Sequence, residues 1–127
     1  MKTMLIVDDE PAIRSIISRW AETRGYAVAE ADGADAGLAR MHQRAADVAV
    51  CDLNMPGHDG RWFAEEVRKA FPETGVVMIT GVDKREAEAR IPEGVVTWLV
   101  KPFRLSDLVQ AMDQVVIWRQ AHVTLHQ

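Results

Sequence analysis

Four short apolar runs of the sequence are each followed directly by side chains that could do chemistry. Asp8, Asp9 and Glu10 follow the first run, and the later runs are followed by Asp52, Thr80 and Lys101. Taken singly, each residue has an ordinary interpretation as a helix cap, a turn residue or a solvated charge. If the runs are neighbouring strands, however, these carboxylates, the hydroxyl and the ammonium group meet at one edge of a sheet. Such a set suits the stabilisation of a transferring phosphoryl group.

Several convergent carboxylates need a compensating positive charge. Two like charges about 4 Å apart repel by roughly 4 kcal/mol at an effective dielectric constant of about 20, so crowded acids either raise a pKa or hold a cation. The set offers oxygen ligands, with no His or Cys pair beside it. Oxygen ligands favour Mg²⁺ over Zn²⁺, with Mn²⁺ as the alternative hard ion. The sequence therefore predicts a magnesium-dependent site.

The apolar runs alternate with stretches of helical period, which predicts repeated strand–helix units. The strands are expected at Met4–Val7, Ala27–Ala29, Val48–Cys51, Val76–Ile79 and Val95–Val100. The helices are expected from Pro11 to a stop at Gly25, over Ala34–Arg44, Gly60–Ala70 and Lys84–Ile91, and from an N-cap at Ser106 onward. Strands separated by helices form a parallel sheet covered on both faces. The fold class is therefore a doubly wound α/β sandwich, whose site lies at the carboxyl ends of the strands.

Three of the expected helices carry apolar residues three and four positions apart, which is typical of helices that pack on a sheet. The residues expected to face inward are Ile13, Ile16, Ile17 and Trp20 in the first helix, Trp62, Phe63 and Val67 in the third, and Leu108, Val109, Met112, Val115, Val116 and Trp118 in the last. The fourth helix is short and charged, so it is expected to be weakly anchored.

The composition limits the class of protein. With 127 residues, of which 48% are hydrophobic and 27% charged, the chain is expected to form one domain over residues 1–121, followed by a tail at 122–127. A net charge of −4 offers no basic face, so this segment is not expected to bind nucleic acid. No run approaches the roughly 18 apolar residues of a membrane span. The single Cys51 lies in an apolar run, which indicates a reduced, buried thiol and favours the cytoplasm.

The motifs at the strand ends resemble those of a known family, the receiver domains of bacterial response regulators in two-component signalling. The matching stretches are Val7-Asp8-Asp9-Glu10, the segment from Asp52 to Gly60, Thr80-Gly81 and Lys101-Pro102-Phe103. They cover nearly the whole chain and stand in the family's order. The resemblance implies a flavodoxin-like (βα)5 sandwich like that of chemotaxis regulators, with a five-stranded parallel sheet in the order 2-1-3-4-5.

The resemblance also implies a role for each acid. Asp52 would attack the phosphoryl group of a phosphohistidine and become an acyl phosphate. Beside Asp52, Asp9 would bind Mg²⁺ directly, Asp8 through water, and Asn54 through its backbone carbonyl. The segment would thus be a phosphoprotein that needs magnesium for its modification.

Two further positions complete the resemblance. Lys101 would pair with one phosphoryl oxygen, Thr80 would donate a hydrogen bond to another, and the bond from Lys101 to Pro102 is usually cis in the family. Three residues before this lysine the family usually carries Tyr or Phe, which acts with the threonine as a conformational switch. This chain has the bulkier Trp98 there. The signalling switch is thus expected at Thr80 and Trp98.

The implied function is that of a phosphoacceptor in a phosphorelay, which gains and loses its own phosphoryl group and is not a turnover enzyme. The donor would be a sensor histidine kinase or a histidine phosphotransfer protein. Phosphorylation would switch the face formed by the fourth helix, fifth strand and fifth helix, and so signal to a downstream protein or a covalently linked output domain. The chain is expected to be either a stand-alone receiver or the receiver part of a longer protein.

Rival interpretations agree less well with the residues. A flavodoxin-like electron carrier needs a hydroxyl- and glycine-rich loop after strand one, where this chain carries acids. An aspartyl phosphatase uses an Asp-x-Asp spacing, which the acids after the first run lack. A degenerate receiver would lack part of the set that is present. His58 and the pair His122 and His126 are interpreted as surface residues and not as ligands.

Overall fold

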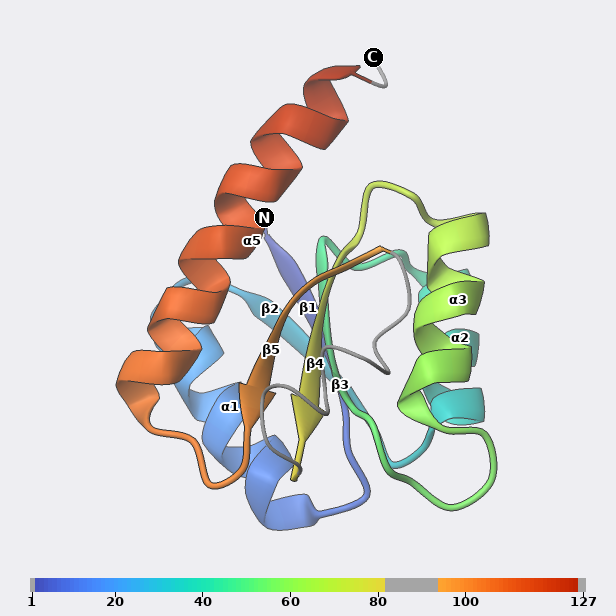
Figure 1. The fold of residues 1–127 in the computed structure, drawn as a ribbon, viewed down its shortest axis with the longest axis vertical. Coiled ribbons are helices and arrows are strands. Elements are labelled where there is room, and N and C mark those ends of the chain that lie inside the picture. The colour runs from blue at the N-terminus through green and yellow to red at the C-terminus, as the bar shows by residue number, and fades with distance from the viewer. Residues whose placement is uncertain (1, 82–93, 126–127) are drawn as a thin grey trace.

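The computed structural model of the chain describes residues 2–81 and 94–125. Its elements follow one another as strands and helices (Figure 1). In chain order they are β1 (Thr3–Val7), α1 (Pro11–Thr23), β2 (Ala27–Ala31), α2 (Ala34–Gln43), β3 (Val48–Asp52), α3 (Gly60–Ala70), β4 (Gly75–Thr80), β5 (Val95–Val100) and α5 (Leu105–Leu125). The helix expected over Lys84–Ile91 lies outside the described residues.

The strands form one parallel sheet in the order β2-β1-β3-β4-β5. This confirms the predicted α/β fold class and strand order. The expected bounds of β5 and α3 match the structure, and the other strands are longer than expected by one or two residues at an end. The first helix ends at Thr23, ahead of the expected stop at Gly25, which has a φ of 87°. The positive φ suits a glycine directly after a helix.

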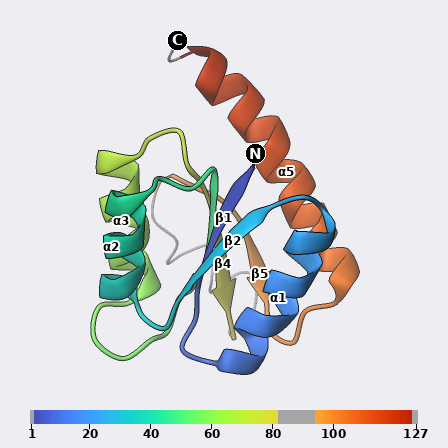
Figure 2. The ribbon, with the colours of Figure 1, turned by 180° about the vertical axis from the view of Figure 1, so that it is seen from behind.

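Helices cover both faces of the sheet. In Figures 1 and 2, α1 and α5 lie on one face, and α2 and α3 lie on the other. Successive residues of β1 point to opposite faces, so Met4 and Ile6 belong to the core under α1 and α5, while Leu5 and Val7 belong to the core under α2 and α3. Because both faces are covered, the central strands β3 and β4 are buried throughout.

Two residues predicted to face inward are exposed instead. Ile16 of α1 is 54% exposed and Val116 of α5 is 41% exposed. The buried stripe of α5 includes Leu108, Met112 and Val115, three and four residues apart. Val116 stands eight residues after Leu108, about 80° around the helix from it, so it lies at the border of that stripe and the width of the contact with the sheet decides its exposure.

The expected N-cap at Ser106 is also wrong. The helix α5 begins at Leu105, and the carboxylate of Asp107 accepts a hydrogen bond from the Arg104 N–H at 2.9 Å. That carboxylate compensates an amide at the helix start, as a capping side chain does. At the other end α5 continues to Leu125, so the expected tail at 122–127 begins inside a helix.

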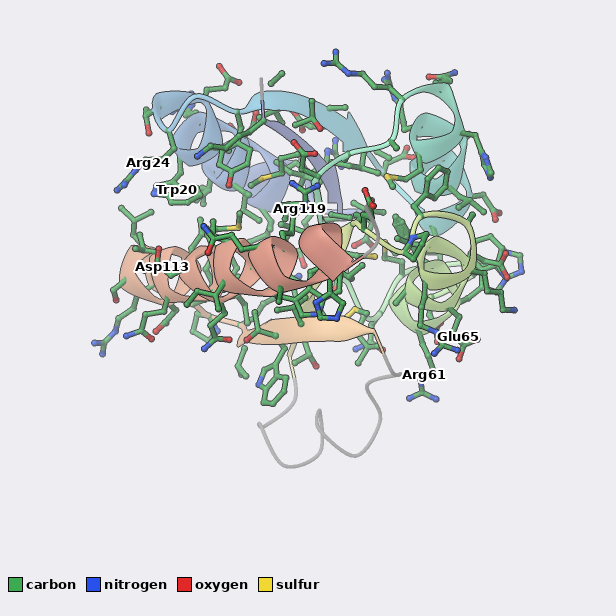
Figure 3. The ribbon with its side chains drawn as sticks, turned by 90° about the horizontal axis from the view of Figure 1, so that it is seen from above. Trp20, Arg24, Arg61, Glu65, Asp113 and Arg119 are labelled. Carbon is green, nitrogen blue, oxygen red and sulfur yellow. The ribbon has the colours of Figure 1, made fainter. Side chains whose placement is uncertain are left out.

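The later turns of α5 are tied to the amino ends of the strands. Figure 3 shows Arg119 on this helix, and its side chain forms an ion pair with Asp47 at 3.2 Å and donates to the Glu73 carbonyl oxygen at 3.1 Å. On the neighbouring α1, the Arg24 guanidinium lies 5.4 Å from the ring of Trp20 (Figure 3). No helix within residues 2–81 and 94–125 is both long and apolar enough to span a membrane.

Candidate functional site

The carboxyl ends of four strands bring the predicted site residues to one edge of the sheet, at the bottom of Figure 1. The last residues of the strands are neighbours, because Val7 pairs with Cys51, Asp52 with Ile79, and Thr80 with Val100. The residues that carry chemical groups end or directly follow these strands. They are Asp8, Asp52, Thr80 and Lys101.

Four carboxylates converge at this edge. Asp8, Asp9, Glu10 and Asp52 each offer one oxygen, and these oxygens all lie within 4.8 Å of one another. Asp8 is fully buried and Asp52 is only 5% exposed, whereas Asp9 and Glu10 are exposed. The cluster therefore has a buried pair of acids and an open side that faces solvent.

The Lys101 ammonium lies among these acids. Its Nζ is 3.0 Å from Glu10 Oε1, 3.2 Å from Asp52 Oδ2 and 3.5 Å from Asp8 Oδ2. The side chain is 20% exposed, so its contacts are shielded from water more than those of a surface ion pair. Lys101 thus compensates part of the negative charge of the cluster.

Burial and crowding shift the pKa values at this edge. Burial raises the pKa of Asp8 above its ordinary value of 3.8, and the Asp52 charge adds to the rise. Burial likewise raises the pKa of Asp52, against the opposing effect of Lys101. Burial alone would lower the pKa of Lys101, but the hydrogen bond to Glu10 and the Asp52 charge raise it above its ordinary value. For Asp8 and Asp52, the effect of burial on the pKa therefore outweighs the compensation that the lysine supplies.

The donor set fits a hard divalent cation. All four groups offer oxygen, and the buried Asp8 Oδ2 accepts no hydrogen bond in the structure. Its nearest positive charge is the Lys101 ammonium at 3.5 Å, which is an ion-pair distance without hydrogen-bond geometry. A buried carboxylate oxygen in this state is suited to bind a cation or a water molecule that a cation holds.

The loop after β3 approaches the Asp52 backbone closely. A Cβ atom at Gly60 would overlap the Asp52 carbonyl oxygen, which no side chain could tolerate. The Gly60 amide donates to the Leu53 carbonyl at 2.9 Å, and the Asn54 amide donates to Asp52 Oδ1 at 3.3 Å. Gly57 has a φ of 79°, in the region that favours glycine. The loop therefore needs both glycines.

The strand ends beside the acids carry the two expected switch residues. Thr80 is fully buried, and its carbonyl accepts a hydrogen bond from the Lys101 amide at 2.7 Å. Trp98 is half-buried in β5, opposite Met78 of β4. The bond between Lys101 and Pro102 is cis, as the resemblance implied.

Sequence reasoning gave no role to two residues that contact this edge. Glu10 was noted in the acidic run, but its hydrogen bond with Lys101 was not foreseen. Arg14 donates from Nη1 to the Asp8 carbonyl at 2.7 Å. Arg14 lies in the first turn of the helix that follows the acids. A long side chain at that position points toward the start of the helix, and this could have indicated a contact with the acidic loop.

The structure also places His58, His122 and Cys51, to which the sequence analysis gave no chemical role. His58 is exposed, pairs with Asp35 at 2.8 Å and stacks on Trp62 at 3.9 Å, so it lies on the surface as expected. His122 contacts the Trp118 carbonyl at 2.9 Å, and His126 lies outside the described residues. Cys51 is buried and free, and burial raises its thiol pKa well above the ordinary value.

Comparison with known proteins decides the family. The profile of the response regulator receiver domain matches residues 4–113 of the chain. The chain belongs to this family. Its function is therefore that of a receiver domain in two-component signalling.

Curated and solved relatives agree with this membership. The nitrogen assimilation regulatory protein NtrX of Azorhizobium caulinodans is 35% identical over 109 residues, which are 84% of this receiver domain and 24% of the relative. The chemotaxis response regulator CheY4 of Vibrio cholerae is 32% identical, with a TM-score of 0.80, and the match covers 91% of this chain and 98% of that one. The match covers 23% of the response regulator protein FleR of Pseudomonas aeruginosa and 61% of the photosynthetic apparatus regulatory protein RegA of Rhodobacter capsulatus, so the chain spans only part of the length of these relatives.

One solved relative is a complex with Mg²⁺ and BeF. The response regulator TrrA of Thermotoga maritima, in complex with Mg²⁺ and BeF, is 25% identical with a TM-score of 0.81, and the match covers 91% of this receiver domain and 99% of that chain. Receiver domains bind Mg²⁺ at an acidic pocket, and the carboxylate cluster of this chain is consistent with such binding.

Proposed function

We propose that this receiver domain accepts a phosphoryl group on Asp52 in a magnesium-dependent reaction. The observation that carries the proposal is the position of the Asp52 carboxylate. It lies within 4.8 Å of three further carboxylates and 3.2 Å from the Lys101 ammonium. No ordinary structural role requires a nearly buried acid among three other carboxylates, because the crowding of like charges lowers the stability of the fold.

The proposed transfer is a simple displacement at phosphorus. An Asp52 oxygen forms a bond to the phosphorus of a donor phosphohistidine while the nitrogen–phosphorus bond breaks, and the electron pair of that bond stays with the imidazole nitrogen. Lys101 gives up contact with the acids to pair with a phosphoryl oxygen, and Thr80 donates a hydrogen bond to another. Water later hydrolyses the acyl phosphate, so the domain is a phosphoacceptor that resets itself and not a turnover enzyme.

The proposed cation site uses the residues of the acidic cluster. Asp9 would bind the ion directly and Asp8 through water, and Asp52 and the Asn54 carbonyl would complete the protein's ligands. When bound, Mg²⁺ or Mn²⁺ would neutralise the carboxylates and polarise the phosphoryl oxygens. The exposed Asp9 suits direct binding from the solvent side.

The partners follow from the family. We propose a sensor histidine kinase or histidine phosphotransfer protein as donor, and a downstream protein or linked output domain as recipient of the signal. The proposed domain is residues 1–121 with a tail at 122–127, and it binds neither nucleic acid nor membrane. The buried, reduced Cys51 fits a cytoplasmic protein.

Treatment with acetyl phosphate tests the acceptor. We expect the intact-protein mass to rise by one phosphoryl group in the wild type with Mg²⁺, and uptake to be abolished by Asp52→Asn or by a chelator. The exposed Asp32, which follows β2 at the same sheet edge, supplies the matched control. Asp32→Asn should retain full uptake. Equal uptake by Asp52→Asn, or uptake that a chelator leaves unchanged, would contradict the proposal.

A second prediction concerns Trp98 as the switch. Because Trp98 is half-buried in the strand next to the one that ends in Thr80, movement of the Thr80 hydroxyl toward a phosphoryl group should change the surroundings of the indole. The emission of the wild type minus that of Trp98→Phe isolates this ring from the other three tryptophans. We expect the difference spectrum to change when beryllofluoride and Mg²⁺ are added. An unchanged spectrum in a protein that binds the mimic would place the switch elsewhere.

A further inference from the structure

Arg14 links the first helix to two different strand ends. Its Nη1 donates to the Asp8 carbonyl oxygen at 2.7 Å, and its Nε donates to Glu30 Oε1 at 3.2 Å. Glu30 lies in β2, the edge strand beside β1. The Arg14 side chain is only 19% exposed and Glu30 is 42% exposed, so the contact with the Asp8 carbonyl is better shielded from water than the contact with Glu30.

The carbonyl that Arg14 holds belongs to the peptide between Asp8 and Asp9, two acids of the cation cluster. The same loop is fixed by two other contacts. The Asp8 amide donates to the Ala31 carbonyl at 3.1 Å, and the Glu10 amide donates to Asp8 Oδ1 at 2.9 Å. Arg14 supplies the contact on the carbonyl side of this peptide. Rotation of the peptide plane would move the backbone of Asp9 relative to that of Asp8.

Arginine is suited to this place because its guanidinium offers N–H groups that point in separate, fixed directions. One donor meets a carbonyl in the β1–α1 loop while another meets a carboxylate on β2. Glu30 thereby orients the plane of the guanidinium that holds the Asp8 carbonyl. The single ammonium of a lysine could approach either acceptor, but it would lack this planar fork.

We propose that Arg14, oriented by Glu30, is a positioning residue that holds the Asp8–Asp9 peptide in the geometry required to bind a divalent cation. The proposal rests on the proposed function of the acidic cluster as the cation site. It extends that function to residues on α1 and β2 that touch neither the cation nor the phosphoryl group. Residues that hold metal ligands in this way commonly contribute to metal affinity.

The direction of the change in Mg²⁺ affinity distinguishes a positioning role of Arg14 from a simple effect of its charge. Arg14 brings a positive charge next to an acidic cluster, so removal of that charge alone should strengthen the binding of a cation. Loss of the hydrogen bond to the Asp8 carbonyl should instead weaken binding, because Asp8 and Asp9 are no longer held in place. The two effects have opposite directions in one measurement.

The test is calorimetric titration of the unphosphorylated full chain with Mg²⁺ at fixed ionic strength. We expect Arg14→Gln to weaken Mg²⁺ binding by about tenfold, the lower end of the range for residues that hold metal ligands. The matched control is Arg19→Gln, which removes the same charge from an exposed position of the same helix. That variant should stay within about twofold of the wild type. Equal or tighter binding by Arg14→Gln would overturn the proposal.

A conservative variant keeps the test decisive if Arg14→Gln does not fold. Arg14→Lys retains the charge and most of the stem but not the fork, so it should still bind Mg²⁺ at least about threefold more weakly. Wild-type affinity in Arg14→Lys would overturn the proposal. Excess Mg²⁺ should restore phosphoryl uptake in either folded variant, and failure of this rescue would also contradict a positioning role.

Failure of the proposal for Arg14 can be distinguished from failure of the proposed function of Asp52. A wild-type protein that binds Mg²⁺ but takes up no phosphoryl group from acetyl phosphate would overturn Asp52 as the acceptor, whereas the effect of Arg14 on Mg²⁺ affinity would still be measured. If the wild type takes up phosphoryl and the Arg14 variants bind Mg²⁺ as tightly as it does, only the role of Arg14 fails.

Discussion

Replacing Asp8 with Asn is expected to stabilise the metal-free protein. Asp8 is fully buried, its Oδ2 accepts no hydrogen bond from the described residues, and the Asp52 carboxyl lies in the same cluster. An Asn side chain keeps the Oδ1 acceptor for the Glu10 amide and removes the buried charge. We expect a gain of about 1–2 kcal/mol in the free energy of unfolding. For a domain of this length, that gain corresponds to a rise of about 4–10 °C in melting temperature.

The pH dependence of this gain follows from the direction of the pKa shift. Because the pKa of Asp8 is raised in the folded state above 3.8, the native protein binds more protons than the unfolded chain between 3.8 and the raised value. In that window the stability contributed by Asp8 falls as the pH rises, and the loss is complete above the raised pKa. The advantage of Asp8→Asn should therefore be constant above the raised pKa of Asp8 and should vanish below about 3.8.

Thermal melts of wild type and Asp8→Asn, with chelator and with Mg²⁺, measure both effects. Mg²⁺ should raise the melting temperature of the wild type and do so much less for the variant, because one ligand of the cluster is lost. Asp32→Asn, which changes an exposed carboxylate, is the control for charge alone. If Asp8→Asn melts below the wild type in chelator, the buried acid is satisfied in the folded protein and not repelled.

The fold could be predicted because its determinants are local. The run Met4–Val7 ends at Asp8, and the run Val95–Val100 lies between Gly94 and Lys101. The helix α3 begins directly after the capping carboxylate of Asp59, which accepts from the Trp62 amide at 3.0 Å. The convergence of Asp8 and Asp52 follows from the adjacency of β1 and β3. That adjacency came from the family resemblance and not from the spacing of residues.

The parts that could not be predicted depend on which neighbour a side chain meets in three dimensions. The period of α1 allowed Ile16 in the buried stripe, but the width of the contact with the sheet decides its exposure. The contacts of Glu10 with Lys101, 91 positions apart, and of Arg14 with Glu30, 16 positions apart, join elements that no local pattern brings together. The charge pattern of a sequence indicates which residues could form such contacts, but the packing of the helices and strands determines which of them become partners.

Lys101→Met is expected to have the opposite effect on stability to Asp8→Asn. The lysine compensates Glu10, Asp52 and Asp8 at 3.0–3.5 Å, so its loss leaves the buried acids without their nearest positive charge. Removal of one partner of a buried pair costs about 3–5 kcal/mol. Because the lysine side chain is 20% exposed, we expect a smaller loss of about 2–3 kcal/mol in chelator. Because Met keeps much of the apolar stem of the lysine, the loss of stability measures the effect of removing the charge.

Mg²⁺ should reverse most of this destabilisation. The lysine and the cation compensate the same carboxylates, so the variant without the lysine should bind Mg²⁺ more tightly than the wild type and gain more melting temperature from it. Phosphoryl uptake on Asp52 should remain detectable, but the Trp98 emission change should be lost, because no ammonium group pairs with the phosphoryl oxygen.

A double-mutant cycle links the two predictions. In chelator, the cost of Lys101→Met should be smaller in the Asp8→Asn background, because one of the acids that the lysine compensates is already neutral. If the two changes are additive, Asp8 and Lys101 do not interact despite their distance of 3.5 Å. If Lys101→Met weakens Mg²⁺ binding, the lysine positions the acids and does not compete with the cation, and the division of roles between phosphoryl-binding lysine and cation-binding carboxylates is wrong.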